Sequence, residues 1–392
     1  MISKVKLLAD KYFNEILEIR RHLHKHPELS FKEFKTSDYI QKFLKSKNIP
    51  FTSGHVKTGI IAKIKGINPD KKKILLRADL DALPIHEENE ISYKSVNKGV
   101  MHACGHDVHT SSLLGAMLIL NDLTNSFEGT VECVFQPGEE LLPGGAKLMI
   151  EEGLLDSAPS CCLAQHVFPD LEAGKVGFKS GMYMASTDEI HVKVKGKGGH
   201  AALPNKLIDP VLMAAQLITN IQQIISRNNQ PTDPSVLSFG YIKADGATNV
   251  IPDEVHIKGT FRTFNEKWRK EAHAKMKKLA NSICVGMGGE CEFIIKEGYP
   301  FLKNDSTITE IAKIAAQKFL GAENVVDLPL RMTAEDFSYF SQVSPSCFYR
   351  LGTGNDNNIQ NLHTSTFNID ESALKTGMGL MSFIALEQLV KL

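Results

Sequence analysis

The sequence lacks net charge and lacks long apolar runs. Its 45 lysines and arginines balance 45 aspartates and glutamates, so no bulk electric field attracts nucleic acid or an anionic membrane surface. Residues 1–10 have no continuous apolar core of the kind a signal peptide needs, and no apolar stretch elsewhere is long enough to span a membrane. We therefore expect a cytoplasmic protein that binds neither nucleic acid nor a membrane.

The cysteines and glycines of the sequence also lack the spacings of disulfide frameworks, zinc modules and dinucleotide-binding loops. Its 7 cysteines are an odd number without framework spacing, which favours a reducing cytosol over a disulfide scaffold. A structural zinc module would use pairs such as CxxC, and none is present. The stretch GKGGHA at residues 196–201 lacks the final glycine of the dinucleotide-binding pattern GxGxxG, and no βαβ pattern follows it. A nucleotide-binding oxidoreductase is therefore disfavoured.

Both ends of the chain alternate strand-like with helix-like stretches. The expected helices cover residues 1–26, 30–44, 108–123, 145–152, 307–319 and 370–390. The expected strands cover residues 59–64, 73–78, 130–135 and 161–166. This alternation predicts an α/β layer with functional groups at the C-terminal ends of its strands.

Near residue 185 the pattern becomes one of alternating apolar and polar residues. Strands are expected at 189–196, 235–243, 254–262 and 290–296, and helices at 209–226 and 266–286. The order β-α-β-β-α-β predicts a small antiparallel sheet with two helices on one face. We expect one domain formed by residues 1–183 and 299–392, into which an α+β, ferredoxin-like domain at residues 184–298 is inserted.

Side chains that bind metals are concentrated at residues 101–110, MHACGHDVHT. Thiolate, imidazole and carboxylate together suit a borderline-soft divalent metal. Further donors follow apolar runs at Glu139, Glu140, His166 and His363. Loop histidines are most often solvated, and a buried cysteine is most often a small hydrophobe. Donors supplied by several separate strand ends nevertheless indicate an enzyme site.

Seven motifs in order make the chain resemble the M20 family of metallopeptidases and amidohydrolases over nearly its whole length. They are RADLDALP at 77–84, MHACGHDVHT at 101–110, FQPGEE at 135–140, GGHAALP at 198–204, TNVIPD at 248–253, GTFRTF at 259–264 and LHTSTF at 362–367. The likeness is strongest to the branch of N-acyl-amino-acid amidohydrolases, which includes hippurate hydrolases, N-acetyldiaminopimelate deacetylases and plant auxin-conjugate hydrolases. It implies an α/β, mixed-sheet metallo-hydrolase catalytic domain, with the inserted domain acting as a lid or dimerisation domain.

The resemblance also implies two divalent metal ions per subunit, zinc or manganese. Its five implied ligands are Cys104, His106, Glu140, His166 and His363. Five donors are too few for two ions that each take about three protein ligands, so one donor must bridge. The sequence leaves open which donor that is.

The resemblance makes Glu139 the general base that removes a proton from the attacking water. The wider family has a His-x-Asp signature where this chain has Asp79-Leu80-Asp81. Asp79 therefore stands at the histidine ligand position, and Cys104 and His106 supply donors instead. This departure favours the amidohydrolase branch over the aminoacylase and carboxypeptidase branches, and it leaves an orienting role for Asp81.

In the inserted domain, Asn249 and Arg262 are candidates to hold a substrate carboxylate, because an amide and a guanidinium are suitable donors. A strand arginine is otherwise most often a surface residue. By resemblance, His200 reaches the site of the other subunit in a homodimer formed through this domain. His102 and His109 are interpreted as groups that orient ligands or cap loops.

Together these features predict a dinuclear amidohydrolase that cleaves an acetyl or aromatic acyl group from the nitrogen of a small amino-acid substrate. One alternative is a dipeptidase or carboxypeptidase-like hydrolase of the same family. The other is a catalytically silent, metal-stabilised binding protein. A silent scaffold needs ligands but no spare carboxylate beside them, so Glu139 favours the enzyme.

Overall fold

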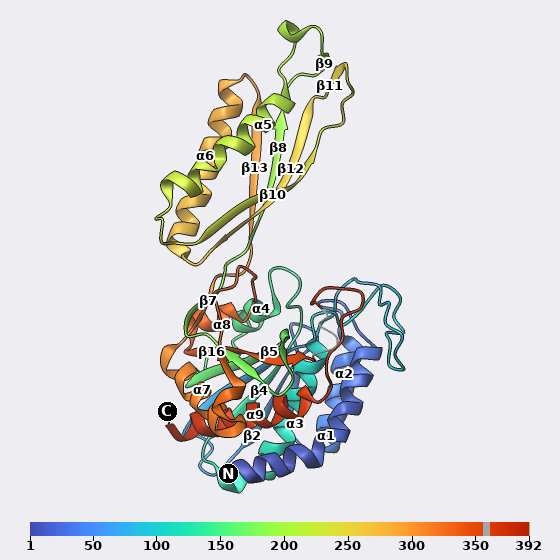
Figure 1. Cartoon of the computed structure of the whole chain (residues 1–392), viewed down its shortest axis with the longest axis vertical. Helices are drawn as coiled ribbons and strands as arrows, with labels where there is room; N and C mark the ends of the chain where they lie inside the picture. The colour runs from blue at the N-terminus through green and yellow to red at the C-terminus, as the bar shows by residue number, and fades with distance from the viewer. Residues whose placement is uncertain (356–360, 392) are drawn as a thin grey trace. The chain divides into compact units, whose positions relative to one another are not determined.

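A computed structural model describes residues 1–355 and 361–391, and these form two compact units (Figure 1). The first unit consists of Met1–Tyr183, Lys303–Leu330 and the described part of Asp336–Leu392. The second consists of Met184–Leu302 and Arg331–Glu335. Residues 299–302 and 331–335, which the sequence pattern groups with the first domain, thus pack with the second. The roles of catalytic domain and of lid or dimerisation domain stay predictions.

The first unit contains a mixed, 8-stranded sheet with the order β1-β2-β4-β3-β5-β16-β6-β15. The strands are β1 (Phe51–His55), β2 (Gly59–Lys65), β3 (Lys73–Asp79), β4 (Thr130–Gln136), β5 (Cys161–Glu172), β6 (Val176–Phe178), β15 (Val325–Asp327) and β16 (Ser346–Gly354). β3 pairs in parallel with β4 and with β5, and β5 pairs in parallel with β16. β1, β2 and β4 pair antiparallel. The predicted mixed-sheet α/β fold is confirmed.

Helices pack around this sheet (Figure 1). They are α1 (Ile2–Lys25), α2 (Phe34–Ser46), α3 (His106–Asp122), α4 (Gly145–Glu151), α7 (Ser306–Leu320), α8 (Ser338–Val343) and α9 (Ala373–Lys391). α3 is buried without a break from His106 to Leu120. A Cβ at Gly115 would meet Met378 on α9 and Ile16 on α1, so glycine permits the close approach of these three helices. None of the described helices is both long and apolar enough to cross a membrane.

β16 is the main element that the sequence pattern did not predict. Every residue from Ser346 to Gly354 is buried, because the strand lies between β5 and β6 inside the sheet. A strand buried on both faces has no alternation of apolar and polar residues. Its register places Arg350 beside His166 on β5.

The second unit has the ferredoxin-like arrangement that its strand and helix order predicts. Its antiparallel sheet has the order β10-β12-β8-β13. Its elements are β8 (Asp188–Lys195), α5 (Pro210–Ile221), β10 (Ser235–Lys243), β12 (Glu254–Thr263), α6 (Glu266–Gly286) and β13 (Glu290–Glu297), with the short pair β9 (Gly199–His200) and β11 (Val250–Ile251). The predicted helix 209–226 ends early as α5, and a π-helical turn follows at Ile224–Asn228.

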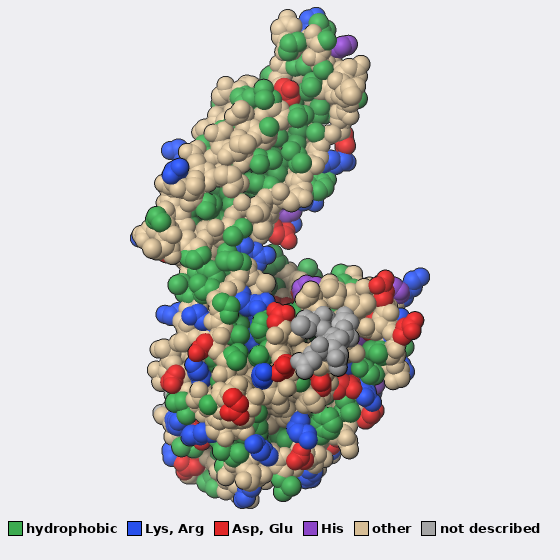
Figure 2. Space-filling view, viewed as in Figure 1, with side chains coloured by type: hydrophobic (Ala, Val, Ile, Leu, Met, Phe, Trp, Pro, Cys, Tyr) green, Lys and Arg blue, Asp and Glu red, His purple; other side chains and the backbone are tan. Residues whose placement is uncertain are grey.

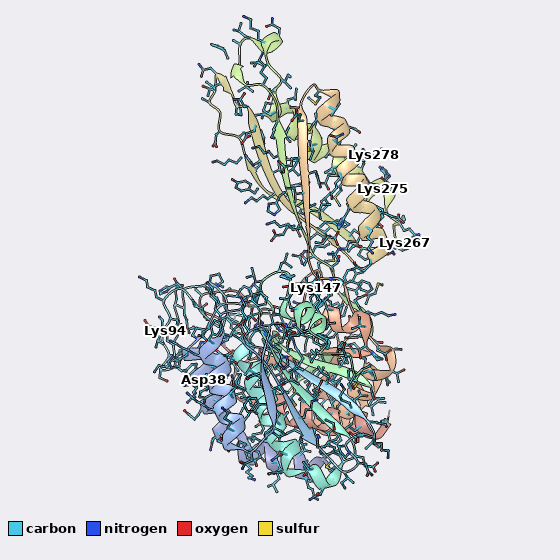
Figure 3. The ribbon with its side chains drawn as sticks, turned by 180° about the vertical axis from the view of Figure 1, so that it is seen from behind. Asp38, Lys94, Lys147, Lys267, Lys275 and Lys278 are labelled. Atoms are coloured by element: carbon cyan, nitrogen blue, oxygen red, sulfur yellow. The ribbon has the colours of Figure 1, made fainter. Side chains whose placement is uncertain are left out.

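The helices of the second unit begin at capping side chains and bury one face. Asp209 and Asn265 each accept hydrogen bonds from two backbone N–H groups in the first turns of α5 and α6. The buried side of α6 carries Trp268, Ala272 and Met276. Its lysines at 267, 275 and 278 project outward in Figure 3. α6 is therefore an amphipathic helix with a solvated outer face.

The surface agrees with the balanced composition. In the view of Figure 2, basic and acidic side chains are interspersed over the first unit without a large field of one sign. This distribution is the one expected of a protein without a strong electrostatic preference for polyanions.

A buried ion pair joins α1 to α3 directly beside the metal-binding motif. Arg20 Nε donates to Asp107 Oδ2 at 2.9 Å, and neither side chain is exposed. His24 Nδ1 lies 2.8 Å from the same oxygen. Although burial alone would raise the pKa of Asp107, Arg20 and His24 hold it far below its usual range. The pair therefore contributes stability above the ordinary aspartate pKa and loses it in strong acid.

We predict that Asp107→Asn destabilises the metal-free protein by about 3–5 kcal/mol, because it leaves the Arg20 guanidinium buried without its closest carboxylate. The matched control is Asp122→Asn, since Asp122 pairs with Lys11 between the same two helices at 3.0 Å but in an exposed position. Thermal unfolding followed by circular dichroism compares the two variants. Equal shifts of the unfolding midpoint would contradict the prediction.

Candidate metal centre

Three neighbouring strands deliver the candidate site. β3 ends at Asp79 directly beside Gln136, the last residue of β4. β5, on the other side of β3, carries His166. Because these strands are parallel, their C-terminal ends meet at one edge of the sheet. The sequence following β3 and the turn Gln136–Glu140 therefore lie next to each other.

A glycine turn presents Cys104 and His106 to the same edge. Gly105 lies between them and precedes α3 with a φ of 81°, a conformation that glycine adopts without strain. A Cβ at Gly105 would stand 2.5 Å from a methyl carbon of Val167 on β5. The loop that carries His363 is attached to this turn, because its N–H donates to the carbonyl of Ala103 at 2.8 Å.

The structure brings together all five residues predicted to be metal ligands. Cys104 Sγ lies 3.5 Å from His166 Nε2 and 3.3 Å from His363 Nε2. Cys104, His106 and His166 form one group of candidate donors, and Cys104, Glu140 and His363 form a second, with the donor atoms of each group within 4.8 Å of one another. Cys104 is the member that both groups share.

Two buried polar atoms at this site are suited to bind a metal ion. His106 Nε2 and Glu140 Oε1 are buried without a hydrogen-bond partner among the described residues, and they lie 3.9 Å apart. His166 donates from Nδ1 to the Val167 carbonyl at 2.8 Å, which leaves Nε2, on the side of Cys104, as the ring nitrogen able to bind a metal. Imidazole nitrogens, a thiol sulfur and a carboxylate oxygen that converge in this way are the ligands that divalent cations take, so the residues present suit metal ions.

The electrostatics of the donors favour a cation as well. Burial lowers the pKa of His106, but the carboxylates of Asp79, Asp81 and Glu140 outweigh it and raise that pKa to about 10. Burial, with Glu140 and other carboxylates, raises the pKa of the Cys104 thiol well above its ordinary value. Without metal, both groups therefore hold protons at neutral pH. Metal ions that bind here displace those protons and take over their role of balancing the carboxylates.

Asp81 orients the donors. Its Oδ1 lies 3.2 Å from His106 Nδ1, which directs Nε2 of that ring to the other donors. Its Oδ2 accepts hydrogen bonds from the Glu140 N–H at 2.9 Å and from the Ser30 hydroxyl at 2.6 Å. One carboxylate thus fixes a ligand ring and the backbone of another ligand.

Asp79 is held by neighbours that the sequence did not connect with it. Arg77 Nη1 donates to its Oδ2 at 2.6 Å, and His109 Nδ1 contacts its Oδ1 at 2.6 Å. His109 Nε2 accepts the Val167 N–H at 2.9 Å, so both ring nitrogens of His109 are engaged. His109 therefore links the Asp79 carboxylate to the backbone of Val167. His102, by contrast, is buried with no hydrogen bond to any described residue.

Glu139 lies beside the ligand cluster with only 6% of its surface exposed. Its Oε2 is 4.0 Å from His106 Nε2, and its Oε1 accepts the Asp336 N–H at 3.4 Å. It belongs with His106 and Glu140 to a further group of neighbouring donors. A carboxylate in this position can exchange a proton with a water held by ions at the centre.

The other predicted site residues belong to the second unit and lie in two places. His200 on β9 is exposed and opposes Val250 of β11, next to exposed Asn249. Arg262 is near the far end of β12 and half-buried, and its Nε donates to Thr260. β9 and β11 lie beyond the end of β12 where Glu254 begins the strand (Figure 1). The eight residue steps from 254 to 262 span about 26 Å of strand.

Two charged groups of the site, Arg77 and Asp336, were not predicted from the sequence. Arg77, inside the motif RADLDALP, is fully buried and also bonds Gln136 and Asp336. Asp336 accepts hydrogen bonds from Gln136 and from the Ala146 N–H, which fixes the turn around Glu139. The motif gave a signal for Arg77, but no local pattern distinguishes Asp336 from a loop carboxylate.

The fold and the centre define a metal-dependent hydrolase, in which thiol, imidazole and carboxylate donors stand beside a further carboxylate at the edge of a mixed α/β sheet. Comparison with known proteins agrees with this class. The sequence pattern of peptidase family M20/M25/M40 matches residues 75–387. The chain belongs to this family and is a metal-dependent amide hydrolase.

Named relatives resemble the chain over nearly its full length. It is 39% identical to the N-acetylcysteine deacetylase of Bacillus subtilis, over 94% of this chain and 95% of that protein. It is 35% identical to the thermostable carboxypeptidase 2 of Saccharolobus solfataricus, over 99% and 98%. The solved structure of the YXEP protein of Bacillus subtilis, described as a dinuclear metal-binding peptidase of the M20 family, has a TM-score of 0.83 at 33% identity and covers 98% of this chain and 100% of its own.

We predict that Cys104→Ser lowers the metal content of the purified protein, because a neutral hydroxyl replaces thiolate poorly as a ligand. Cys162→Ser is the matched control, since Cys162 is also buried but belongs to none of the candidate donor groups. Metal analysis measures both variants, and cobalt substitution adds a thiolate-to-cobalt absorption band that Cys104→Ser should remove. Equal metal content and an unchanged band in Cys104→Ser would refute ligation by this thiol.

Proposed function

We propose that the chain removes an acyl group, acetyl or aromatic, from the nitrogen of an amino acid or a related small amide, using two divalent metal ions. The observation that carries this proposal is the convergence of five donors in overlapping groups, in which Cys104, His106 and Glu140 each belong to more than one group. Five protein donors would serve two ions if one of these donors were shared. The name of the deacetylase relative supports the N-acyl substrate.

In this proposal Cys104, His106, Glu140, His166 and His363 hold the ions. Bound divalent ions supply Lewis acidity, which polarises the amide carbonyl and acidifies water. Thiolate and imidazole favour zinc, whereas the carboxylate also suits manganese. All 7 cysteines are free thiols, which supports a reducing location such as the cytoplasm.

Glu139 performs the proton transfers. Its carboxylate accepts a proton from the attacking water as the oxygen bonds to the carbonyl carbon. It then donates this proton to the amide nitrogen as the carbon–nitrogen bond breaks, and the free amine leaves. Its low exposure keeps bulk water from competing for that proton.

A homodimer through the second unit completes the proposal. Within one chain, His200 and Asn249 are separated from Arg262 by most of the length of β12, so they cannot hold one small substrate together. A second copy of the chain could supply His200 and Asn249 while Arg262 comes from the first. This separation supports action across subunits.

A small substrate panel tests the reaction. N-acetyl and N-benzoyl amino acids are incubated with metal-free protein and with protein loaded with zinc or manganese, and release of free amine is measured. Benzyloxycarbonyl dipeptides are included because the carboxypeptidase relative makes peptide hydrolysis the rival activity. Preferential cleavage of the dipeptides would favour peptide hydrolysis. Absence of cleavage of every substrate would contradict both activities.

We predict that Glu139→Gln retains nearly normal metal content but loses at least about 10²-fold in kcat, the usual contribution of a general base. The amide keeps the size of the side chain but cannot accept the proton. Metal analysis and turnover are measured on the same preparation. Retention of nearly the wild-type kcat would mean that another residue is the base.

The trans role of His200 gives a separate prediction. His200→Ala should lower kcat strongly, because an oxyanion donor typically contributes about 10²–10³-fold. Mixing His200→Ala chains with Glu139→Gln chains should restore activity, because each heterodimer then has one complete site. Random exchange gives about one quarter of the wild-type activity in a two-fold dimer.

The mixing result depends on subunit exchange, which mass spectrometry of differently tagged chains measures. With exchange confirmed and both parents inactive, failure to recover activity would refute action in trans. Such a result would leave the hydrolase assignment intact, because the substrate panel tests that separately.

A further inference from the structure

A second buried carboxylate contacts the turn that carries Glu139. Glu33 is completely buried, just before α2. Its Oε1 accepts hydrogen bonds from the Gly138 N–H at 2.9 Å and from the Phe31 N–H at 2.8 Å. Its Oε2 accepts the Thr58 hydroxyl at 2.8 Å. Gly138 immediately precedes Glu139, so this carboxylate holds the backbone next to the proposed base.

The same turn is packed against Phe31. Gly138 has a φ of 63°, and a Cβ there would stand 2.4 Å from two carbons of the Phe31 ring. Phe31 itself has a φ of 62°, which is costly for an aromatic residue. The Glu33 carboxylate bonds the N–H of Phe31 as well as that of Gly138. One side chain therefore supports both the strained Phe31 backbone and the Gly138 backbone that it contacts.

The segment that contains Glu33 also contacts the candidate ligands through Asp81. Ser30 donates to Asp81 Oδ2, which also accepts the Glu140 N–H. The backbone of Ala82 donates to the carbonyl of Glu28 at 2.8 Å. Residues 28–33 thus contact both sides of the Glu139-Glu140 pair, through Gly138 on one side and Asp81 on the other.

The ionisation of Glu33 does not itself stabilise the fold. Burial, with the nearby Asp81 carboxylate, raises the pKa of Glu33 to about 7. A carboxyl group whose pKa is raised in the folded protein costs stability wherever it is ionised. A group that costs stability and contacts a catalytic turn fits a role in positioning.

We infer that Glu33 is a positioning residue, which fixes the Gly138 backbone so that the Glu139 carboxylate meets the metal-held water and the leaving amine. This inference rests on the proposed role of Glu139. Misplacement of a catalytic group by about 1 Å can cost up to about 10²-fold in rate.

Two substitutions of similar size test the inference. Glu33→Gln keeps an oxygen for the Gly138 and Phe31 N–H groups, and its amide can donate to the Thr58 oxygen. Glu33→Met keeps the volume but removes every acceptor. We expect Glu33→Met to lower kcat about tenfold or more, with unchanged KM and metal content, while Glu33→Gln stays within about threefold of wild type.

Hydrogen exchange at Gly138 provides a readout that needs no substrate. The Gly138 amide should exchange faster in Glu33→Met than in wild type or Glu33→Gln, because its acceptor is gone. Unchanged exchange in Glu33→Met, or faster exchange with an unchanged kcat, would overturn the inference. A loss of activity that merely follows a loss of metal would do the same. If the wild type cleaves no N-acyl substrate, the proposed function fails, while exchange still decides whether Glu33 holds the turn.

Discussion

Buried negative charge is the constraint on which the first unit depends. Asp79, Asp81 and Glu139 all lie inside the protein at the edge of one sheet, and isolated carboxylates in such places cost several kcal/mol each. Arg77 and His109 compensate Asp79, and His106 lies against Asp81. His106 Nε2 and Glu140 Oε1, which have no hydrogen-bond partner in the described part of the chain, lie 3.9 Å apart. This arrangement of charges suits the binding of divalent cations.

Much of the fold could be predicted because apolar residues recur along most of its elements with the period of a strand or of a helix. The strands of the second unit are half-solvated, so their alternation is visible in the sequence. β16 is buried on both faces and shows no period. The helix expected at 30–44 begins only at Phe34, because Ser30 and Phe31 are held by contacts to the site rather than by helical hydrogen bonds. Such tertiary contacts override local propensity and cannot be read from a single segment.

The candidate site was predictable where its chemistry is local. A cysteine and a histidine two residues apart, or two adjacent glutamates, signal their function in the sequence itself. The supporting residues give no such signal, because Arg77, Glu33 and Asp336 act through partners that are remote in the chain. The shared role of Asn249 and Arg262 stays a prediction. Their chemistry suggested one shared carboxylate, and the strand between them separates them within a single chain.

The position of β16 also determines when the metal centre can form during synthesis. This strand lies between β5 and β6 in the sheet. It nevertheless leaves the ribosome after both segments of the second unit, Met184–Leu302 and Arg331–Glu335. The second unit contains its own core and can fold while the sheet of the first is still incomplete. His363 follows β16, so the nascent chain lacks one of its five candidate ligands until nearly all of it has been translated. The full set of five candidate ligands therefore exists only when synthesis of the chain is nearly finished.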